Sequence, residues 1–217
     1  MLRLYGPARA ERIVSRLEPT LREMSRQYGI PGAYILAVFR KEIADIDIFD
    51  PLADMAVWFY WFRYSLRRGL CRLGLARRPE PLLRQGPFGK RDSSTGFGQI
   101  FAFVGIKAIN YALDHGLDTP EGLGVPRGRR LSPRDSEDLR RIWMRLVRDR
   151  SFNARLSILN LIAAAEEMNG RTDFAAYGPE EIQRTLTRYN ADVRTVTAYG
   201  RETYRYYLAY ERDAAAV

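Results

Sequence analysis

The stretch PGAYILAVFRKEIADID, residues 31–47, decides the fold. Apolar side chains recur in it at helical spacing, and Pro31 suits a first helical turn, so it predicts a helix from Pro31 to about Ala44. Glu42 lies near the end of this helix, just before a loop. Apolar surroundings disfavour an ionised carboxylate and raise its pKa, so Glu42 is a candidate general acid at neutral pH.

Helical periodicity continues on both sides of this stretch. Further helices are expected over about residues 8–28, 50–72, 98–116, 132–148 and 151–169, from 179 onward and over 202–211. Segments rich in Gly and Pro predict loops at 74–96 and 116–133. No alternating strand pattern exceeds a few residues. We therefore expect a single all-α domain over residues 1–217, with at most a minor β-hairpin in a loop.

Composition excludes several classes of chemistry. The single cysteine, Cys71, excludes an intrachain disulfide, and the single histidine, His115, excludes a multi-histidine metal site. The longest apolar runs are too short to span a bilayer. The N-terminal MLRLYGP has no apolar signal core, so the sequence shows no export route. We expect a soluble protein whose chemistry rests on carboxylates.

The basic charge is concentrated in one segment. The chain has a net charge of +9, and Arg63–Arg91 holds nine basic residues against the single acid Glu80. Such a patch suits a polyanion, either nucleic acid, an anionic membrane or an acidic cell-wall polymer. The alternative is a solvated arginine-rich helix. No nucleic-acid-binding motif is present, which argues against a nucleic-acid partner.

Three short fragments downstream of Glu42 carry polar groups suited to a sugar. They are SSTGFGQI at 93–100, NARLSILN at 153–160 and RYNA at 188–191, and Tyr199-Gly200 and Glu202-Thr203 follow them. The glycines of the first fragment allow a close approach to a ligand, and Gln99 offers a hydrogen-bonding amide. Tyr189 and Asn190 supply a stacking ring and a second amide. By itself, the first fragment is equally consistent with a glycine-rich turn before a helix.

Taken together and in this order, the fragments resemble lytic transglycosylases and goose-type lysozymes. The resemblance covers most of residues 31–207. It implies a lysozyme-like α-helical fold that binds peptidoglycan glycan strands and cleaves the β-1,4 bond between N-acetylmuramic acid and N-acetylglucosamine. It makes Glu42 the general acid. The residues that it places in the cleft are Gly96, Phe97, Gln99, Tyr189 and Asn190.

The sequence departs from the family pattern at several positions. Ile43 replaces the Ser that usually follows the catalytic Glu, Gly98 replaces a Met, and Asp192 replaces the last Gly of the Tyr-Asn motif. A long insertion, about residues 51–91, separates Glu42 from Gln99. We expect it to be helical, to pack the aromatic run 57–62 into the core and to present arginines to an anionic cell-wall polymer or lipid.

The role of a second carboxylate stays open. Transglycosylases use one Glu as acid and then as base, which would leave Glu42 to act alone, whereas inverting lysozymes need a distant Asp to activate water. Asp92, just before the glycine turn, is the candidate for that role. Other carboxylates nearby are Asp45, Asp47, Asp50 and Asp54. The first three also suggest calcium, but the turn glycine and terminal Glu of an EF-hand are missing, so we expect no metal.

Transglycosylation is the favoured function, and the rivals are a hydrolytic muramidase and a catalytically silent cell-wall-binding domain on the same fold. A Ser or Cys hydrolase using His115 lacks a nucleophile-elbow motif. No cofactor is expected. The resemblance implies action in the periplasm or cell wall, and the sequence does not indicate whether an inhibitor or immunity protein accompanies the chain.

Overall fold

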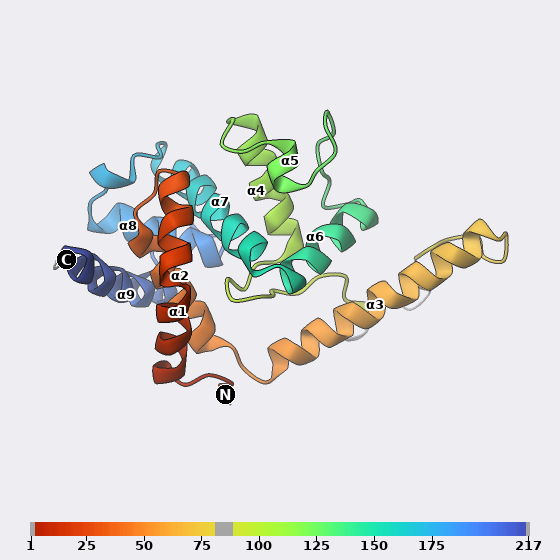
Figure 1. Cartoon of the computed structure of the whole chain (residues 1–217), viewed down its shortest axis with the longest axis horizontal. Helices are drawn as coiled ribbons and strands as arrows, with labels where there is room; N and C mark the ends of the chain where they lie inside the picture. Colours follow the sequence, from red (N-terminus) through yellow and green to blue (C-terminus); the bar gives the residue numbers. More distant parts are fainter. Residues whose placement is uncertain (1–2, 81–88, 216–217) are drawn as a thin grey trace.

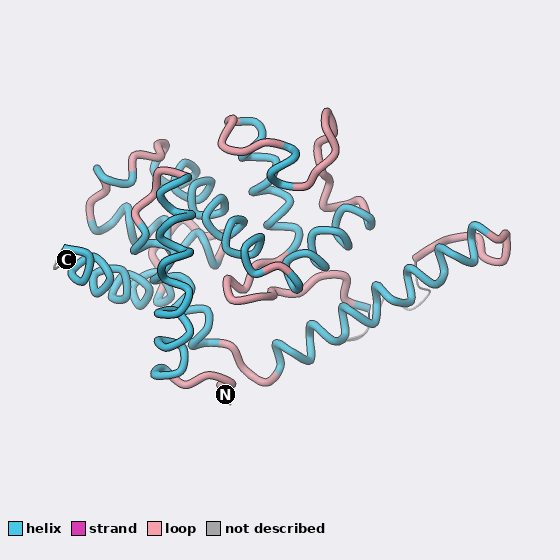
Figure 2. The backbone as a smooth tube through the Cα atoms, in the orientation of Figure 1, coloured by secondary structure: helices cyan, strands magenta, loops and turns pink. Residues whose placement is uncertain are grey.

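Figures 1 and 2 show the computed structural model, in which helices are joined by loops. The structure describes residues 3–80 and 89–215. Within these two ranges there is no β-strand, only isolated bridges that pair Arg3 with Asp47 and Thr95 with Ile100. The all-α prediction is confirmed, and the minor hairpin is reduced to the second bridge.

The helices follow one another along the chain with short connections after most of them. They are α1 (Pro7–Gln27), α2 (Gly32–Asp45), α3 (Phe49–Arg72), α4 (Ala102–Asp114), α5 (Pro120–Leu123), α6 (Ser136–Arg148), α7 (Arg150–Asn169), the 3-10 helix η2 (Phe174–Ala176), α8 (Pro179–Asn190) and α9 (Ala198–Ala215). Pro7 and Pro179 stand in the first turns of their helices, as proline prefers.

The central helix is α2, which is buried on every side from Ala33 to Ala44. A helix that is apolar all round must be enclosed by others. The helices α1 and α9 pack along it, although they come from opposite ends of the sequence. On the other side of the molecule α7 packs against both α4 and α8. One hydrophobic core therefore runs from α1 through α2 to α7.

Two helices begin four residues later than expected. The helix expected from Gly98 begins at Ala102, because Thr95 and Ile100 first pair across a tight turn. The helix expected from Ser132 begins at Ser136, because Asp135 accepts hydrogen bonds from the backbone N–H groups of Glu137 and Asp138. The expected loop at 116–133 also contains α5, and α9 is longer than expected at both ends.

The insertion expected at 51–91 contains α3, which projects from the body of the molecule as a long arm (Figure 1). Residues 81–88, including Arg84, lie outside the described residues. The prediction that the aromatic run packs into the core is only half right. Tyr60 and Trp61 are buried, whereas Trp58, Phe59 and Phe62 are 48%, 43% and 53% exposed.

These three aromatic side chains are exposed because only one face of the arm meets the body. Asp54 accepts hydrogen bonds from the hydroxyls of Ser93 (2.6 Å) and Thr95 (2.8 Å). Further along the same face, Arg68 forms an ion pair with Glu137 of α6 at 2.5 Å. These polar contacts attach α3 along one side, and apolar side chains on its opposite side are exposed.

Candidate active site

Glu42 is buried at the last turn of α2 and lines a cavity of about 890 Å³. Its side chain is the acceptor of a short hydrogen bond, 2.5 Å, from the Tyr199 hydroxyl. Tyr199 belongs to α9, so the packing of α9 on α2 brings these two side chains together. The hydrogen bond therefore holds one oxygen of the Glu42 carboxyl group and leaves the side that lines the cavity accessible to a ligand.

Burial raises the pKa of Glu42 to about 8, because the charged form loses its hydration. The hydrogen bond from Tyr199 acts in the opposite direction, since it stabilises the carboxylate. The nearby carboxylates of Asp45 and Asp50 raise the pKa of Glu42 further, and Lys41 lowers it. At neutral pH the group is therefore mostly protonated, which is the state that a general acid needs.

Lys41 lies next to Glu42 in sequence but is bound to other carboxylates. Its ammonium group is 2.6 Å from Asp45 and 2.6 Å from Glu202 of α9. Lys41 holds the pKa of Glu202 below its usual range by hydrogen bonding to it. This bridge fastens α9 to α2 one helical turn from the Tyr199–Glu42 contact.

The start of α9 approaches α8 very closely, and this approach sets the position of Tyr199. A Cβ on Gly200 would lie 2.0 Å from the Thr187 hydroxyl oxygen, so only glycine fits there. The buried Thr203 hydroxyl donates to the Tyr199 carbonyl at 2.8 Å. Tyr199, Gly200 and Thr203 belong to the sequence motifs, which by themselves assign these residues no role. Their spacing of about one helical turn was the available signal.

The glycine loop, residues 93–100 before α4, is a tight turn, and a buried side chain of α7 bonds to both of its sides. Gly96 has φ +71° and Gln99 has φ +44°, both in the left-handed region. Asn153 of α7 accepts a hydrogen bond from the Gly98 N–H and donates one to the Thr95 carbonyl, both at 2.9 Å. A Cβ on Gly96 would lie 2.3 Å from the Asn153 amide nitrogen. The loop thus requires its glycines in order to press against α7.

Tyr189 closes the other side of this loop. Its buried hydroxyl donates to the Gly98 carbonyl at 2.6 Å and lies 3.1 Å from the Ser157 hydroxyl oxygen. Burial raises the pKa of Tyr189 well above its usual range, so the hydroxyl stays neutral. Tyr189 therefore positions the loop with its hydroxyl while its side chain forms part of the cavity wall.

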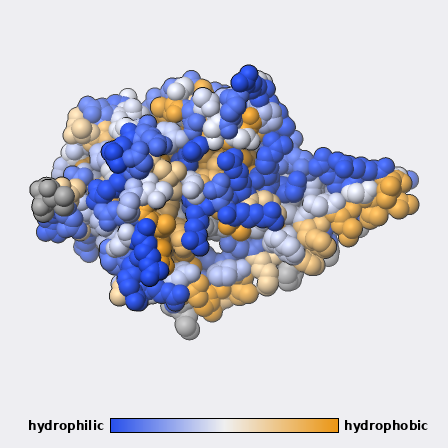
Figure 3. Space-filling view, viewed as in Figure 1, coloured by the Kyte–Doolittle hydropathy of each residue, from blue (hydrophilic) through white to orange (hydrophobic). Residues whose placement is uncertain are grey.

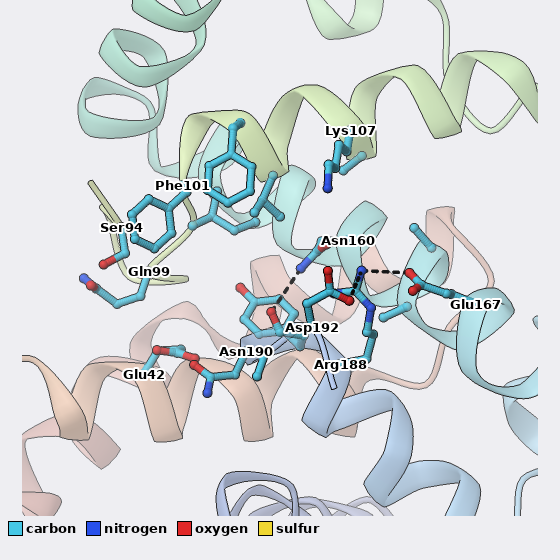
Figure 4. A pocket seen from close by; sticks show the side chains of 18 of the residues that line it. Glu42, Ser94, Gln99, Phe101, Lys107, Asn160, Glu167, Arg188, Asn190 and Asp192 are labelled. Atoms are coloured by element: carbon cyan, nitrogen blue, oxygen red, sulfur yellow. Dashed lines mark hydrogen bonds and ion pairs between the residues drawn. The ribbon is translucent and has the colours of Figure 1, made fainter. Parts of the chain in front are cut away.

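The structure brings together some of the predicted site residues and separates others. Glu42, Gln99, Tyr189 and Asn190 line the same cavity, and Figure 4 shows Glu42, Gln99 and Asn190 at one end of it. Gly96 and Phe97 instead line a second cavity, of about 400 Å³. Phe97 is partly buried there, with the Arg150 guanidinium 5.4 Å from its ring centre. These two residues therefore belong to the loop but do not line the Glu42 cavity.

Asp92 caps a helix. Its two carboxylate oxygens accept hydrogen bonds from the backbone N–H groups of Ala102 and Phe103, each at 2.9 Å. Those N–H groups belong to the first turn of α4, which has no capping side chain of its own. Burial raises the pKa of Asp92 to about 6. Asp92 is absent from the described residues that line the Glu42 cavity.

Of the other candidate carboxylates, some line the Glu42 cavity and others do not. Asp45 and Asp50 line the cavity with Glu42. Asp45 is paired with Lys41 and Arg3, and Asp50 accepts the Asp47 N–H at 2.8 Å. Asp54 holds the glycine loop, as described above. Across residues 3–80 and 89–215, no three His, Cys, Asp or Glu side chains are grouped closely enough to hold a metal ion.

Several cavity residues were not identified from the sequence. Phe101 and Phe103 are each 39% exposed at its wall, and apolar rings of this kind stack on sugars. Lys107, Asn160 and Arg188 lie further along the cavity (Figure 4). Arg188 is paired with Glu167 at 2.8 Å. These residues come from α4, α7 and α8, and nothing in their local sequence shows that the three helices converge.

Comparison of the chain with protein-family models, curated proteins and solved structures found no match. The functional interpretation therefore depends on the cavity itself. Its decisive features are one buried, protonated carboxyl group, a rigid glycine loop and exposed aromatic and amide side chains.

Glu42→Gln is expected to stabilise the protein in a pH-dependent way. Between the ordinary carboxyl pKa of 4.5 and about 8, the folded chain keeps a proton that the unfolded chain releases. The wild type therefore loses stability as pH rises through this range, and the variant does not. In urea unfolding, the variant should match the wild type at about pH 4 and exceed it by at least about 1 kcal/mol at about pH 8. An exposed control, Glu23→Gln, should show no such change, and an offset that is independent of pH would contradict the assignment.

Asn153→Ala is expected to release the glycine loop. The change removes two hydrogen bonds at a side chain that is only 2% exposed. We expect a loss of about 2 kcal/mol or more in the free energy of unfolding, and loss of hydrogen-exchange protection at the Gly98 amide. The control Asn160→Ala removes one long bond, 3.5 Å, and should cost less than about 1 kcal/mol. Retained protection at Gly98 would show that Asn153 does not hold the loop.

Proposed function

We propose that this protein cleaves peptidoglycan glycan strands as a lytic transglycosylase. The bond cleaved would be the β-1,4 linkage between N-acetylmuramic acid and N-acetylglucosamine. The observation that carries the proposal is a protonated Glu42 at the wall of a cavity of about 890 Å³. The order of the sequence fragments and their resemblance to transglycosylases support it.

In the proposed reaction, Glu42 acts twice. It first donates its proton to the glycosidic oxygen, and the bond from that oxygen to the muramic-acid anomeric carbon breaks. The resulting Glu42 carboxylate then takes a proton from the muramic acid's own hydroxyl group, whose oxygen attacks the anomeric carbon and closes an anhydro ring. No water is consumed. The Tyr199 hydroxyl stabilises Glu42 while it is ionised, because it donates a hydrogen bond to Oε1 of the Glu42 carboxylate.

The cavity offers other groups that suit a sugar chain. Gln99, Asn160 and Asn190 supply amides for hydroxyl and acetamido groups, and Phe101 and Phe103 supply apolar rings. The carboxylates of Asp45 and Asp50 stabilise positive charge that develops on the sugar ring in the transition state. Because peptidoglycan lies outside the cytoplasmic membrane, the proposed place of action is the periplasm or cell wall.

A hydrolytic muramidase is the second candidate, and one observation favours it. Asp45 and Asp50 line the same cavity as Glu42, so either carboxylate has access to a water beside the substrate. Asp92 is a weaker candidate for this base, since both of its oxygens cap α4. A silent binding domain on this fold would bind glycan strands without cleaving them.

Digestion of purified sacculi distinguishes these functions. Mass spectrometry should find anhydro-muropeptides, which are lighter than hydrolysed muropeptides by one water. Glu42→Gln should lower the rate by a factor of about 10² or more, while Glu23→Gln leaves it unchanged. Asp92→Asn should lower stability without changing the products. If the products carry free reducing ends and no longer form with the Asp50→Asn variant, the protein is a hydrolase. If the wild type leaves the sacculi intact, it is a silent binding domain.

The pH dependence of kcat/KM tests Glu42 separately. The rate should fall as pH rises above about 8, because ionised Glu42 has no proton to donate. Tyr199→Phe removes a hydrogen bond that lowers the pKa of Glu42, so the alkaline limb should move to higher pH in this variant. A limb that stays in place or moves to lower pH would contradict the role given to Tyr199.

A further inference from the structure

The outer face of α3 is apolar and exposed along most of the helix. Its members share one side of the helix, and their side chains are 43% to 58% exposed. They are Leu52, Met55, Trp58, Phe59, Phe62 and Leu66. Figure 3 shows the same feature as a hydrophobic band along one edge of the arm, with hydrophilic residues along the other. Exposed apolar surface of this extent marks an interaction site.

Basic side chains flank this outer face and extend beyond the end of the helix. The Arg63 guanidinium lies 6.0 Å from the centre of the Phe59 ring, beside the apolar face. Arg72, Arg77 and Arg78 are exposed at the end of the arm. Arg63–Arg91 as a whole has a net charge of +8.

The acids at the start of α3 do not offset this charge on the outer face. Asp54 points toward the glycine loop, where it binds two hydroxyl groups. Asp50 lines the Glu42 cavity. The arm therefore presents an apolar outer face with positive charge beside it at Arg63 and at the end of the arm, and neither acid lies on that face.

This combination is complementary to an anionic lipid surface. Helices that lie in the plane of a membrane interface have aromatic and aliphatic side chains on one face and Lys or Arg beside it. Trp and Phe suit the boundary between headgroups and acyl chains. A second copy of the chain is a poorer match, because two segments of +8 would be brought together. Among the described residues, no helix is long and apolar enough to cross a bilayer.

We propose that α3 docks on the surface of an anionic membrane, with its outer face in the headgroup and acyl-chain boundary. The arginines of the arm contact lipid phosphates. The body of the protein, including the Glu42 cavity, stays outside the bilayer. This docking does not depend on the proposed transglycosylase activity, and its test measures binding without catalysis.

Sedimentation with lipid vesicles tests the apolar contribution. The full chain should bind vesicles that contain phosphatidylglycerol and phosphatidylcholine in equal parts. The triple variant Met55→Ser, Phe62→Ser and Leu66→Ser should bind at least tenfold more weakly. A control that removes three exposed apolar side chains elsewhere on the protein changes Leu4, Val147 and Leu208 to Ser; these residues are 41%, 43% and 42% exposed. This control should bind as the wild type does, and circular dichroism checks that both variants fold.

Charge is tested with the same vesicles. Arg72→Gln, Arg77→Gln and Arg78→Gln together should weaken binding by roughly tenfold to a hundredfold at low salt. The difference should shrink as salt is added, because added ions screen the attraction. The control Arg12→Gln, Arg16→Gln and Arg212→Gln removes the same charge from exposed positions elsewhere and should have little effect.

Three outcomes would overturn the proposal. If the α3 variants and their controls bind equally well, α3 does not form the membrane contact. If the wild type binds pure phosphatidylcholine vesicles as well as the mixed vesicles, anionic lipid has no role in the binding. A concentration-dependent dimer in solution that the Met55, Phe62 and Leu66 changes abolish, without vesicle binding by the wild type, would show that a second copy covers this face.

Discussion

The site depends on the burial of one carboxyl group where α2 meets α9. Glu42 is buried at the wall of the cavity, on a helix that is enclosed on every side, and the Tyr199 hydroxyl donates a hydrogen bond to it. Burial keeps Glu42 protonated at neutral pH at a cost in stability, and the Lys41–Glu202 bridge fastens the same two helices one turn away. The chemistry and the packing of the centre are therefore the same feature of the molecule.

The glycine loop opposes Glu42 across the cavity and is rigid for steric reasons. Its glycines let the backbone press against α7, where Asn153 bonds to both sides of the turn. Tyr189 and Asp54 hold the loop from α8 and α3. Gln99 is thereby fixed at the cavity wall without a bound ligand. Such preorganisation reduces the cost of ordering the site when a substrate binds.

The two faces of α3 have different roles. The inner face carries Asp54 and Arg68, which attach the arm to the loop and to α6. The outer face, which includes Phe62, has no part in that attachment and is exposed. The same helix therefore positions the glycine loop and carries the proposed docking surface on its other side. A membrane contact through α3 would set the distance of the cavity from the lipid surface.

The sequence by itself determined the helices, because apolar spacing and the prolines and glycines at helix ends are local properties. It also indicated Glu42 as the candidate acid, since an acidic residue at the end of an apolar helix is visible in the chain. Only the tertiary structure decided what contacts it: Tyr199 is 157 residues away. The same holds for Asp92, which caps a helix ten residues on, and for Phe62, which the pattern placed in the core. Periodicity shows which residues share a face, but the arrangement of the helices decides which faces are covered.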